Sequence, residues 1–167
     1  MIIILRNLCK NFTLLAAFHF SLEAYSDNFD LNIYNNHGVV GLINTPTARS
    51  YDEGTHGIIL YDGSPDQKIT LSSNPYEWLE ASFFYSNIQG KPYPGYEYQD
   101  YKDKGFNVKV RIKEEGILPA IAIGLNDFAG TGFHSSEYIV ASYGINKLDM
   151  HFGLGWGQLD GSNNKMK

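Results

Sequence analysis

The stretch FNVKVRIK, residues 106–113, decides the fold class, because apolar and polar residues alternate in it at every position. A β-strand places successive side chains on opposite faces, so a period of two gives one apolar face and one polar face. A helix would spread Lys109, Arg111 and Lys113 around its circumference and leave no apolar stripe. The stretch therefore predicts a strand.

A second alternating stretch, LDMHFGLGWG, occupies residues 148–157 and also predicts a strand. Its large apolar residues fall on one face, and Asp, His and Gly fall on the other. Ten residues is the length that a tilted strand needs to cross a bilayer, and this alternation is typical of membrane β-barrels. Trp156 near the strand end suits an aromatic girdle at the membrane interface.

The rest of the chain from Gly38 onward consists of short runs separated by Gly, Pro, Asn and Asp, which is typical of consecutive antiparallel strands. A composition of 14% aromatic residues, with 17 Gly and 12 Tyr, also favours strands and turns. We predict an all-β antiparallel meander of seven or eight strands with one long loop. Strand formers are concentrated in residues 78–86, 118–125 and 137–143, short turns are expected at 114–116 and 144–147, and the long loop at 89–104.

The N-terminus has the three-part pattern of a secretory signal peptide. Arg6 and Lys10 precede an apolar run at residues 12–20, and a cleavage point follows Ala24. The alternative is a buried N-terminal helix. We predict a signal peptide at 1–24, a polar linker at 25–36 and a single β-sheet domain at 37–167, part of an outer-membrane β-barrel. A lipid anchor is not predicted, because Cys9 precedes the apolar run instead of following it.

Charge and cysteine content exclude several classes of function. The net charge is −5 and the basic residues are scattered among acidic ones, so we expect no nucleic-acid partner. The single cysteine gives neither a disulfide framework nor a thiolate metal cluster, and we predict no cofactor and no metal. The run GLGWG at 153–157 lacks the spacing of a dinucleotide fingerprint, and we attribute its glycines to a crowded strand face.

Two groups of residues are candidates for a functional site. Asp127, His134 and Glu137 lie close in sequence, but a turn explains them better than a metal or hydrolytic site, because no third positioned group accompanies them. Tyr93, Tyr96, Tyr98 and Tyr101 could stack on sugar rings, although packing of the loop on its own aromatics is the favoured alternative. We predict no catalytic residues and no enzyme activity.

Several blocks of the sequence resemble the YjbH family of Gram-negative exopolysaccharide-biosynthesis outer-membrane proteins. The blocks span about residues 38–160 in the expected order. They are GLINTPTAR at 41–49, WLE at 78–80 with Phe83, Phe84 and Tyr85, LPAIAIGLNDFAGTG at 118–132, SEYIVAS at 136–142 and GLGWG at 153–157.

The resemblance implies a non-catalytic β-barrel of the cell outer membrane that acts in biosynthesis or export of an exopolysaccharide or capsule. Its implied partners are outer-membrane lipid, the polysaccharide and other proteins of the same pathway. Family members are several times longer, so this chain looks like an N-terminal fragment. Because about eight strands are the minimum for closure, we expect the start of a barrel that could not conduct a polymer by itself.

Two rival hypotheses remain open. One is a periplasmic or surface carbohydrate-binding β-sheet module, suggested by the tyrosines of residues 93–101. The other is an enzyme that uses Asp127 or Glu137, which the lack of a coherent acid, base and nucleophile set disfavours.

Overall fold

A computed structural model describes residues 33–157, and all its regular structure is β. A two-stranded ribbon comes first, followed by a meander of seven strands in which each strand pairs antiparallel with the next. The elements are β1 (Gly41–Leu42), β2 (Thr45–Pro46), β3 (His56–Asp62), β4 (Asp66–Tyr76), β5 (Leu79–Tyr93), β6 (Tyr96–Lys113), β7 (Ala120–Asn126), β8 (Ser136–Ile145) and β9 (Leu148–Gly157). The all-β antiparallel prediction is confirmed.

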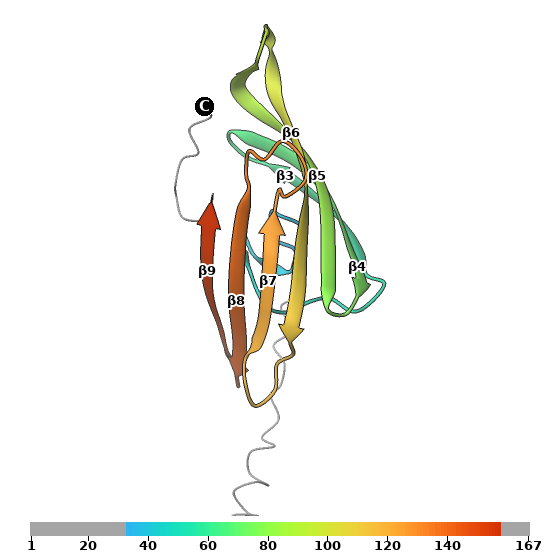
Figure 1. The fold of residues 1–167 in the computed structure, drawn as a ribbon, viewed down its shortest axis with the longest axis vertical. Helices are drawn as coiled ribbons and strands as arrows, with labels where there is room; N and C mark the ends of the chain where they lie inside the picture. Colours follow the sequence, from blue (N-terminus) through green and yellow to red (C-terminus); the bar gives the residue numbers. More distant parts are fainter. Residues whose placement is uncertain (1–32, 158–167) are drawn as a thin grey trace, which may run out of the picture.

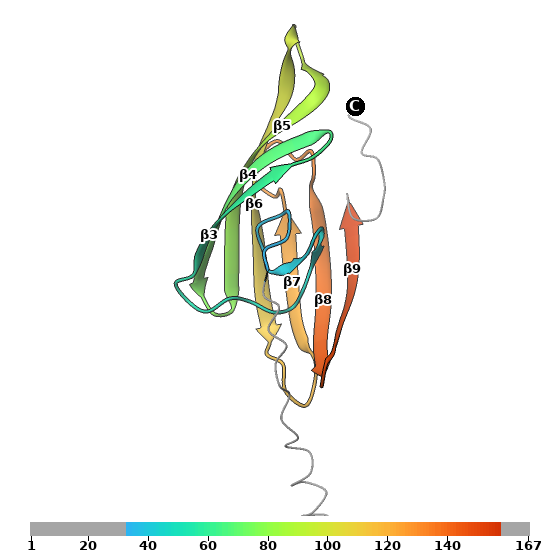
Figure 2. The same ribbon diagram turned by 180° about the vertical axis from the view of Figure 1, so that it is seen from behind.

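The seven-stranded sheet is strongly curved, and residues 33–51 lie within the curve (Figures 1 and 2). We call these residues the inner segment, the sheet face toward them the inner face, and the opposite one the outer face. Within residues 33–157 the sheet does not close, because β3 and β9 each pair with one neighbour only. An antiparallel sheet is thus confirmed, whereas a closed barrel is not observed.

The alternation predicted for residues 106–113 is confirmed, but the polar side is the buried one. Asn107 and Lys109 are 1% and 0% exposed, whereas Phe106 and Ile112 are 46% and 60% exposed. The same inversion extends across the sheet. Apolar or aromatic side chains that are exposed on the outer face include Ile58, Leu60, Ile69, Leu71, Tyr85, Phe106, Ile123, Leu125, Ile139, Met150, Phe152, Leu154 and Trp156.

The inner face is mostly polar. Buried polar side chains from its strands are Thr70, Ser72, Asn74, Glu80, Ser82, Ser86, Asp103, Asn107, Lys109, Asn126, Ser136 and Ser142. One apolar cluster between the inner segment and the sheet consists of Ala48, Ala120, Ala122, Tyr138 and Val140, and Val39, Val40, Phe84 and Ile88 are also buried. In the described residues, the buried polar side chains outnumber the buried apolar ones.

The long loop predicted at residues 89–104 is wrong. These residues form the end of a β-hairpin in which β5 pairs with β6 as far as Tyr93 and Tyr96. Pro92 falls at a register shift and Pro94 in the turn, where no ladder hydrogen bond is lost, so neither proline prevents the strand pairing. Gly95 in that turn has a φ of +84°, a conformation that glycine adopts without strain. The hairpin projects beyond the other strands (Figure 1).

Other predicted boundaries fare differently. The strand at 148–157 is confirmed as β9, with a turn at 146–147 before it. The predicted linker at 25–36 overlaps the packed inner segment, because Asn35 is 1% exposed and Tyr34 pairs with Val40. The predicted signal peptide at 1–24 lies outside the described residues. Residues 33–157 contain no helix that is long and apolar enough to cross a membrane.

Candidate functional site: the polar inner face and its inner segment

The backbone of the inner segment is held by side chains that project from neighbouring strands. The Ser72 hydroxyl on β4 donates to the carbonyl of Gly38 at 2.5 Å. The Ser82 hydroxyl on β5 and the Asn107 amide on β6 both donate to the carbonyl of His37, each at 2.7 Å. These small polar side chains satisfy backbone groups that would otherwise be buried without partners.

A buried ion pair lies at the centre of the inner face. Lys109 Nζ is 2.6 Å from Glu80 Oε2, and both side chains are 0% exposed. Lys109 also donates to the carbonyls of Val40 and Arg49, at 3.1 and 2.7 Å. Glu80 accepts from the Val40 amide at 3.1 Å and from Asn74 at 3.1 Å. Each charge therefore binds both its counter-ion and the inner segment, which offsets the cost of desolvation.

The end of the inner segment is fixed by an arginine. Arg49 donates to Glu115 in the β6–β7 loop at 2.8 Å and to Asp149 on β9 at 2.6 Å. Burial alone would lower the pKa of Arg49, but the hydrogen bonds and charges of the two carboxylates outweigh it and raise the pKa. The amide of Ala48 donates to Ser142 on β8 at 2.8 Å. These contacts attach the segment to the far edge of the sheet.

The start of the inner segment packs near the opposite edge. The ring of Tyr34 occupies the space above Gly57 on β3, where an added Cβ would lie only 2.4 Å from the ring. Asn35 accepts from the amides of His37 and Val39 at 2.9 and 3.2 Å, which closes a tight turn. Burial, with help from the charges of Lys68 and His134, lowers the pKa of His37 to about 3. His37 is therefore neutral at ordinary pH.

A second group of charges lies near the end of the sheet from which the β5–β6 hairpin projects. His134 Nε2 is 3.4 Å from Asp66 and 3.9 Å from Asp103, and its backbone amide donates to Asp127 at 2.9 Å. Burial and the nearby Lys68 lower the pKa of His134, although Asp66 and Asp127 oppose this. The β7–β8 loop is thereby attached to β4 and β6.

The candidate set Asp127, His134 and Glu137 does not converge. Asp127 and His134 meet on the inner side, but Glu137 is exposed on the outer face, opposite Leu125 and Trp156 in the register. Successive residues of a strand point to opposite faces, so closeness in sequence does not bring side chains to the same face. Glu137 on β8 is therefore separated from Asp127 and His134. In the described part of the chain, no three His, Cys, Asp or Glu side chains are placed to hold a metal ion.

The four candidate tyrosines divide into two kinds of environment. Tyr93 packs on Tyr96 and Tyr101, with ring centroids 6.4 and 5.7 Å apart. Tyr101 also packs on Phe133 of the β7–β8 loop at 6.0 Å, and Lys91 lies 3.9 Å from the Phe133 ring centroid. Tyr98 is fully exposed. Sequence reasoning missed Lys91 and Phe133, because only the folded hairpin brings them to the tyrosines.

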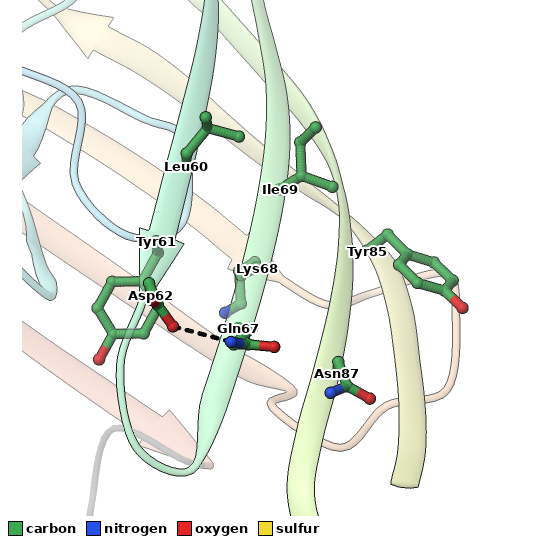
Figure 3. A pocket seen from close by; sticks show the side chains of 8 residues that line it. All are labelled: Leu60, Tyr61, Asp62, Gln67, Lys68, Ile69, Tyr85 and Asn87. Atoms are coloured by element: carbon green, nitrogen blue, oxygen red, sulfur yellow. Dashed lines mark hydrogen bonds between the residues drawn. The ribbon is translucent and has the colours of Figure 1, made fainter. Parts of the chain in front are cut away.

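An open hollow of about 310 Å³ lies over the end of β3 and the start of β4 (Figure 3). Leu60, Ile69 and Tyr85 give it an apolar wall, and a hydrogen bond of 3.0 Å from Gln67 to Asp62 crosses one end. The apolar wall belongs to the outer face. The hollow is therefore an open feature of the outer surface.

Comparison with known proteins identifies the family. Residues 33–167 match the family model YjbH, described as an exopolysaccharide biosynthesis protein. The chain belongs to the YjbH family. Over 158 residues it is 35% identical to the "Uncharacterized lipoprotein YjbH" of Escherichia coli (strain K12), an alignment that covers 90% of this chain and 23% of that relative. The chain thus spans about a quarter of the relative's length. No solved structure matches it.

The motif at residues 41–49, one of the blocks that resemble the YjbH family, has a defined place in the structure. The motif makes up the second half of the inner segment, from β1 to Arg49. Its residues supply one acceptor of the Lys109 ammonium group, the carbonyl of Arg49, and hydrogen bonds to Ser142 on β8 and Asp149 on β9. In this YjbH chain the motif therefore packs against the inner face and links it to β8 and β9.

Proposed function

We propose that this chain forms the first strands of an outer-membrane β-barrel that takes part, without catalysis, in biosynthesis or export of an exopolysaccharide or capsule. The observation that carries the proposal is the inverted alternation of the sheet. Large apolar side chains point outward along every strand from β3 to β9, while charged and polar side chains are buried inside. A soluble protein would leave this apolar face in water, whereas lipid would cover it.

Aromatic side chains at both ends of the outer face support the same proposal. Tyr76 and Trp78 stack at the β4–β5 end, with ring centroids 5.4 Å apart, and both are about half exposed. Trp156 lies near the opposite end of the sheet and is 54% exposed. Between these ends, β8 and β9 have 10 residues each, enough to cross the hydrocarbon layer when tilted. Aromatic girdles occupy the two interfaces of membrane barrels.

The connections suggest an orientation. Strands β4 and β5, like β8 and β9, are joined by two-residue turns at 77–78 and 146–147. The opposite end carries the projecting β5–β6 hairpin and the β7–β8 loop at 127–135 (Figure 1). Outer-membrane barrels have short periplasmic turns and longer extracellular loops. We therefore place the hairpin on the extracellular side, with lipid around the strands and the polysaccharide and other pathway proteins as partners.

Family membership supports the pathway, and the E. coli relative, a lipoprotein, supports a location in the cell envelope. The test is fractionation of cells that produce this protein. We expect it in the outer-membrane fraction, with migration on gels that changes on heating. Ile139→Arg on the outer face should reduce insertion, because a cation at mid-membrane costs about 2–4 kcal/mol, whereas Tyr98→Arg on the hairpin should not. A soluble periplasmic monomer would refute the proposal.

A second candidate function is carbohydrate contact at the β5–β6 hairpin. The grouping of Tyr93, Tyr101 and Phe133 beside Lys91 favours it, because aromatic faces and a cation suit an acidic sugar polymer. Glycan-array binding should fall when Tyr93 and Tyr101 become alanine. Tyr96→Ala and Tyr98→Ala would test the two more exposed rings separately. Unchanged binding in all four variants would exclude this function.

A further inference from the structure

The inner face is the surface on which a polymer would have to travel if these strands lined a channel, and the inner segment already occupies it. We propose that residues 33–51 are a resident plug. The plug closes the pore that these strands would line, so the polymer does not pass through this part of the protein. The inference rests on the proposed barrel, and it assigns a role to the segment that barrel formation alone does not require.

The first argument is the span of the inner segment. At its start Tyr34 packs over Gly57 on β3, and at its end Arg49 binds Asp149 on β9. Between these points the segment accepts hydrogen bonds from β4, β5 and β6 and donates to Ser142 on β8. Ala48 completes the span by packing with Ala120 and Ala122 of β7. The segment thus crosses the inner face from the β3 edge to the β9 edge, within the curve of the sheet (Figure 2).

The second argument is that polar groups of β4, β5 and β6 on the inner face already bind the inner segment. Ser72, Ser82 and Asn107 donate to carbonyls of the inner segment and are at most 5% exposed. A sugar polymer would need such groups for its own hydroxyls. To admit it, the protein would have to break these bonds and expose the inner face, which costs free energy for each polar group left without a partner.

The third argument is electrostatic. Undocking the inner segment would remove two carbonyl acceptors from Lys109 and one amide donor from Glu80. It would also separate Arg49 from Glu115 and Asp149. Buried charges that lose their partners are strongly destabilising. The docked arrangement is therefore the resting state of the plug.

The experiment uses the full-length protein in planar lipid bilayers and in cells. A release variant combines Ser72→Ala, Ser82→Ala and Arg49→Ala, which removes contacts to the plug and leaves the outer face unchanged. We expect it to gain ion conductance over the wild type. Adding Ala48→Cys and Ser142→Cys to the release variant should abolish that gain under oxidising conditions and restore it on reduction. Arg111→Ala, which removes an ion pair with Glu114 and no contact to the plug, is the matched control.

The same cysteine pair, placed in the otherwise native protein, tests whether the plug moves during export. Its disulfide should leave exopolysaccharide secretion at the wild-type level. Loss of secretion on locking would overturn the inference, because the inner segment would then have to leave the inner face. A release variant that inserts normally but gains no conductance would also overturn it.

Thiol labelling separates this inference from the barrel proposal. Val39 lies in the turn of the inner segment and is 0% exposed. In a Val39→Cys variant we expect the introduced thiol to be protected from maleimide in the folded protein. The same thiol should be labelled in denaturant. This readout requires neither a membrane nor conductance. Protection without membrane insertion would reject the barrel and keep the packed segment, whereas rapid labelling of folded, inserted protein would reject the plug.

Discussion

Lys109 and Glu80 show how single residues fix this structure. Both are fully buried and lie 2.6 Å apart, and each also binds the inner segment. Sequence alternation placed Lys109 on the polar face of a strand, which would ordinarily mean a solvated face. The structure instead makes that lysine the centre of the interior, because the inner segment covers it and supplies carbonyl acceptors.

Replacing Lys109 with methionine should strongly destabilise the folded protein. Glu80 would be left as a buried charge without its counter-ion, which costs about 3–5 kcal/mol. A Glu80→Leu/Lys109→Met double variant should recover part of the loss, because neither charge remains. Urea unfolding midpoints would measure both effects. Arg111→Ala should destabilise the protein less than Lys109→Met, because the Glu114 partner of Arg111 is 73% exposed and stays solvated, and equal losses in the two variants would contradict the assignment.

His37 predicts a pH dependence of the docked segment. Its folded-state pKa of about 3 lies below the unfolded value of 6.5. Above pH 6.5 the residue is neutral in both states and has no effect. As the pH falls from 6.5 toward 3, only the unfolded state gains the proton, so the free energy of unfolding decreases, by about 2 kcal/mol at pH 5. His37→Asn should flatten this part of the stability profile relative to wild type, and a profile with the same slope would disprove the assignment.

At the scale of elements, the period of two predicted the strands, but it did not by itself show which of their faces is buried. Residues 106–113 and 148–157 are strands as expected, because alternation is a local property of the chain. Which face is buried depends on what covers it. The inner segment carries no periodic signal of its own, since its order comes from Ser72, Ser82, Asn107 and Lys109 on distant strands.

The candidate sites failed or survived for similar reasons. The end of the β5–β6 hairpin was mistaken for a loop, although the pairing of the two strands continues to Tyr93 and Tyr96. Glu137 was grouped with Asp127 and His134 by sequence distance, although strand β8 turns it to the outer face. The contacts among Tyr93, Tyr101 and Phe133 could not be predicted from the sequence, because they form only where the β5–β6 hairpin meets the β7–β8 loop. Whether these rings bind sugar stays a prediction.

The two tryptophans of the chain test the placement of the strand ends. Trp78 and Trp156 lie at opposite ends of the sheet and are both about half exposed. In lipid vesicles we expect the emission of each to be quenched by lipids brominated near the headgroup and less by lipids brominated at the chain ends. Single-tryptophan variants, Trp78→Phe and Trp156→Phe, would assign each signal. Strong quenching by aqueous acrylamide without any effect of brominated lipid would rule out interfacial placement.

At the scale of the whole molecule, the open sheet has two unpaired edges among the described residues, β3 and β9. Unpaired edges present free backbone donors and acceptors and invite pairing with other chains. The longer members of the family have further chain with which these edges could pair. Residues 33–157 alone lack that partner.

We therefore expect residues 33–157, produced alone in detergent, to self-associate. Gly153 on the β9 edge has room for a side chain, because an added Cβ would be no closer than 3.4 Å to any neighbour. Crowding, expected from the sequence, therefore does not explain this glycine. Gly153→Lys should reduce the association, since a charge that points inward from an edge strand opposes edge-to-edge pairing. Sedimentation velocity would measure this, and a monomeric parent peptide would contradict the expectation.

The reach of Arg49 across the sheet also has a consequence for the order of folding. Arg49 is separated from its partner Asp149 by 100 residues, whereas every strand pairs with its neighbour in sequence. Local hairpins form faster than contacts that close long stretches of chain. The N-terminal segment is synthesised first, yet its last bonds must wait until the final described strand exists. The Arg49–Asp149 pair can therefore serve as a marker of a completed sheet, because a chain that stops before Leu148 could still bind Arg49 through Glu115 but would lack this pair.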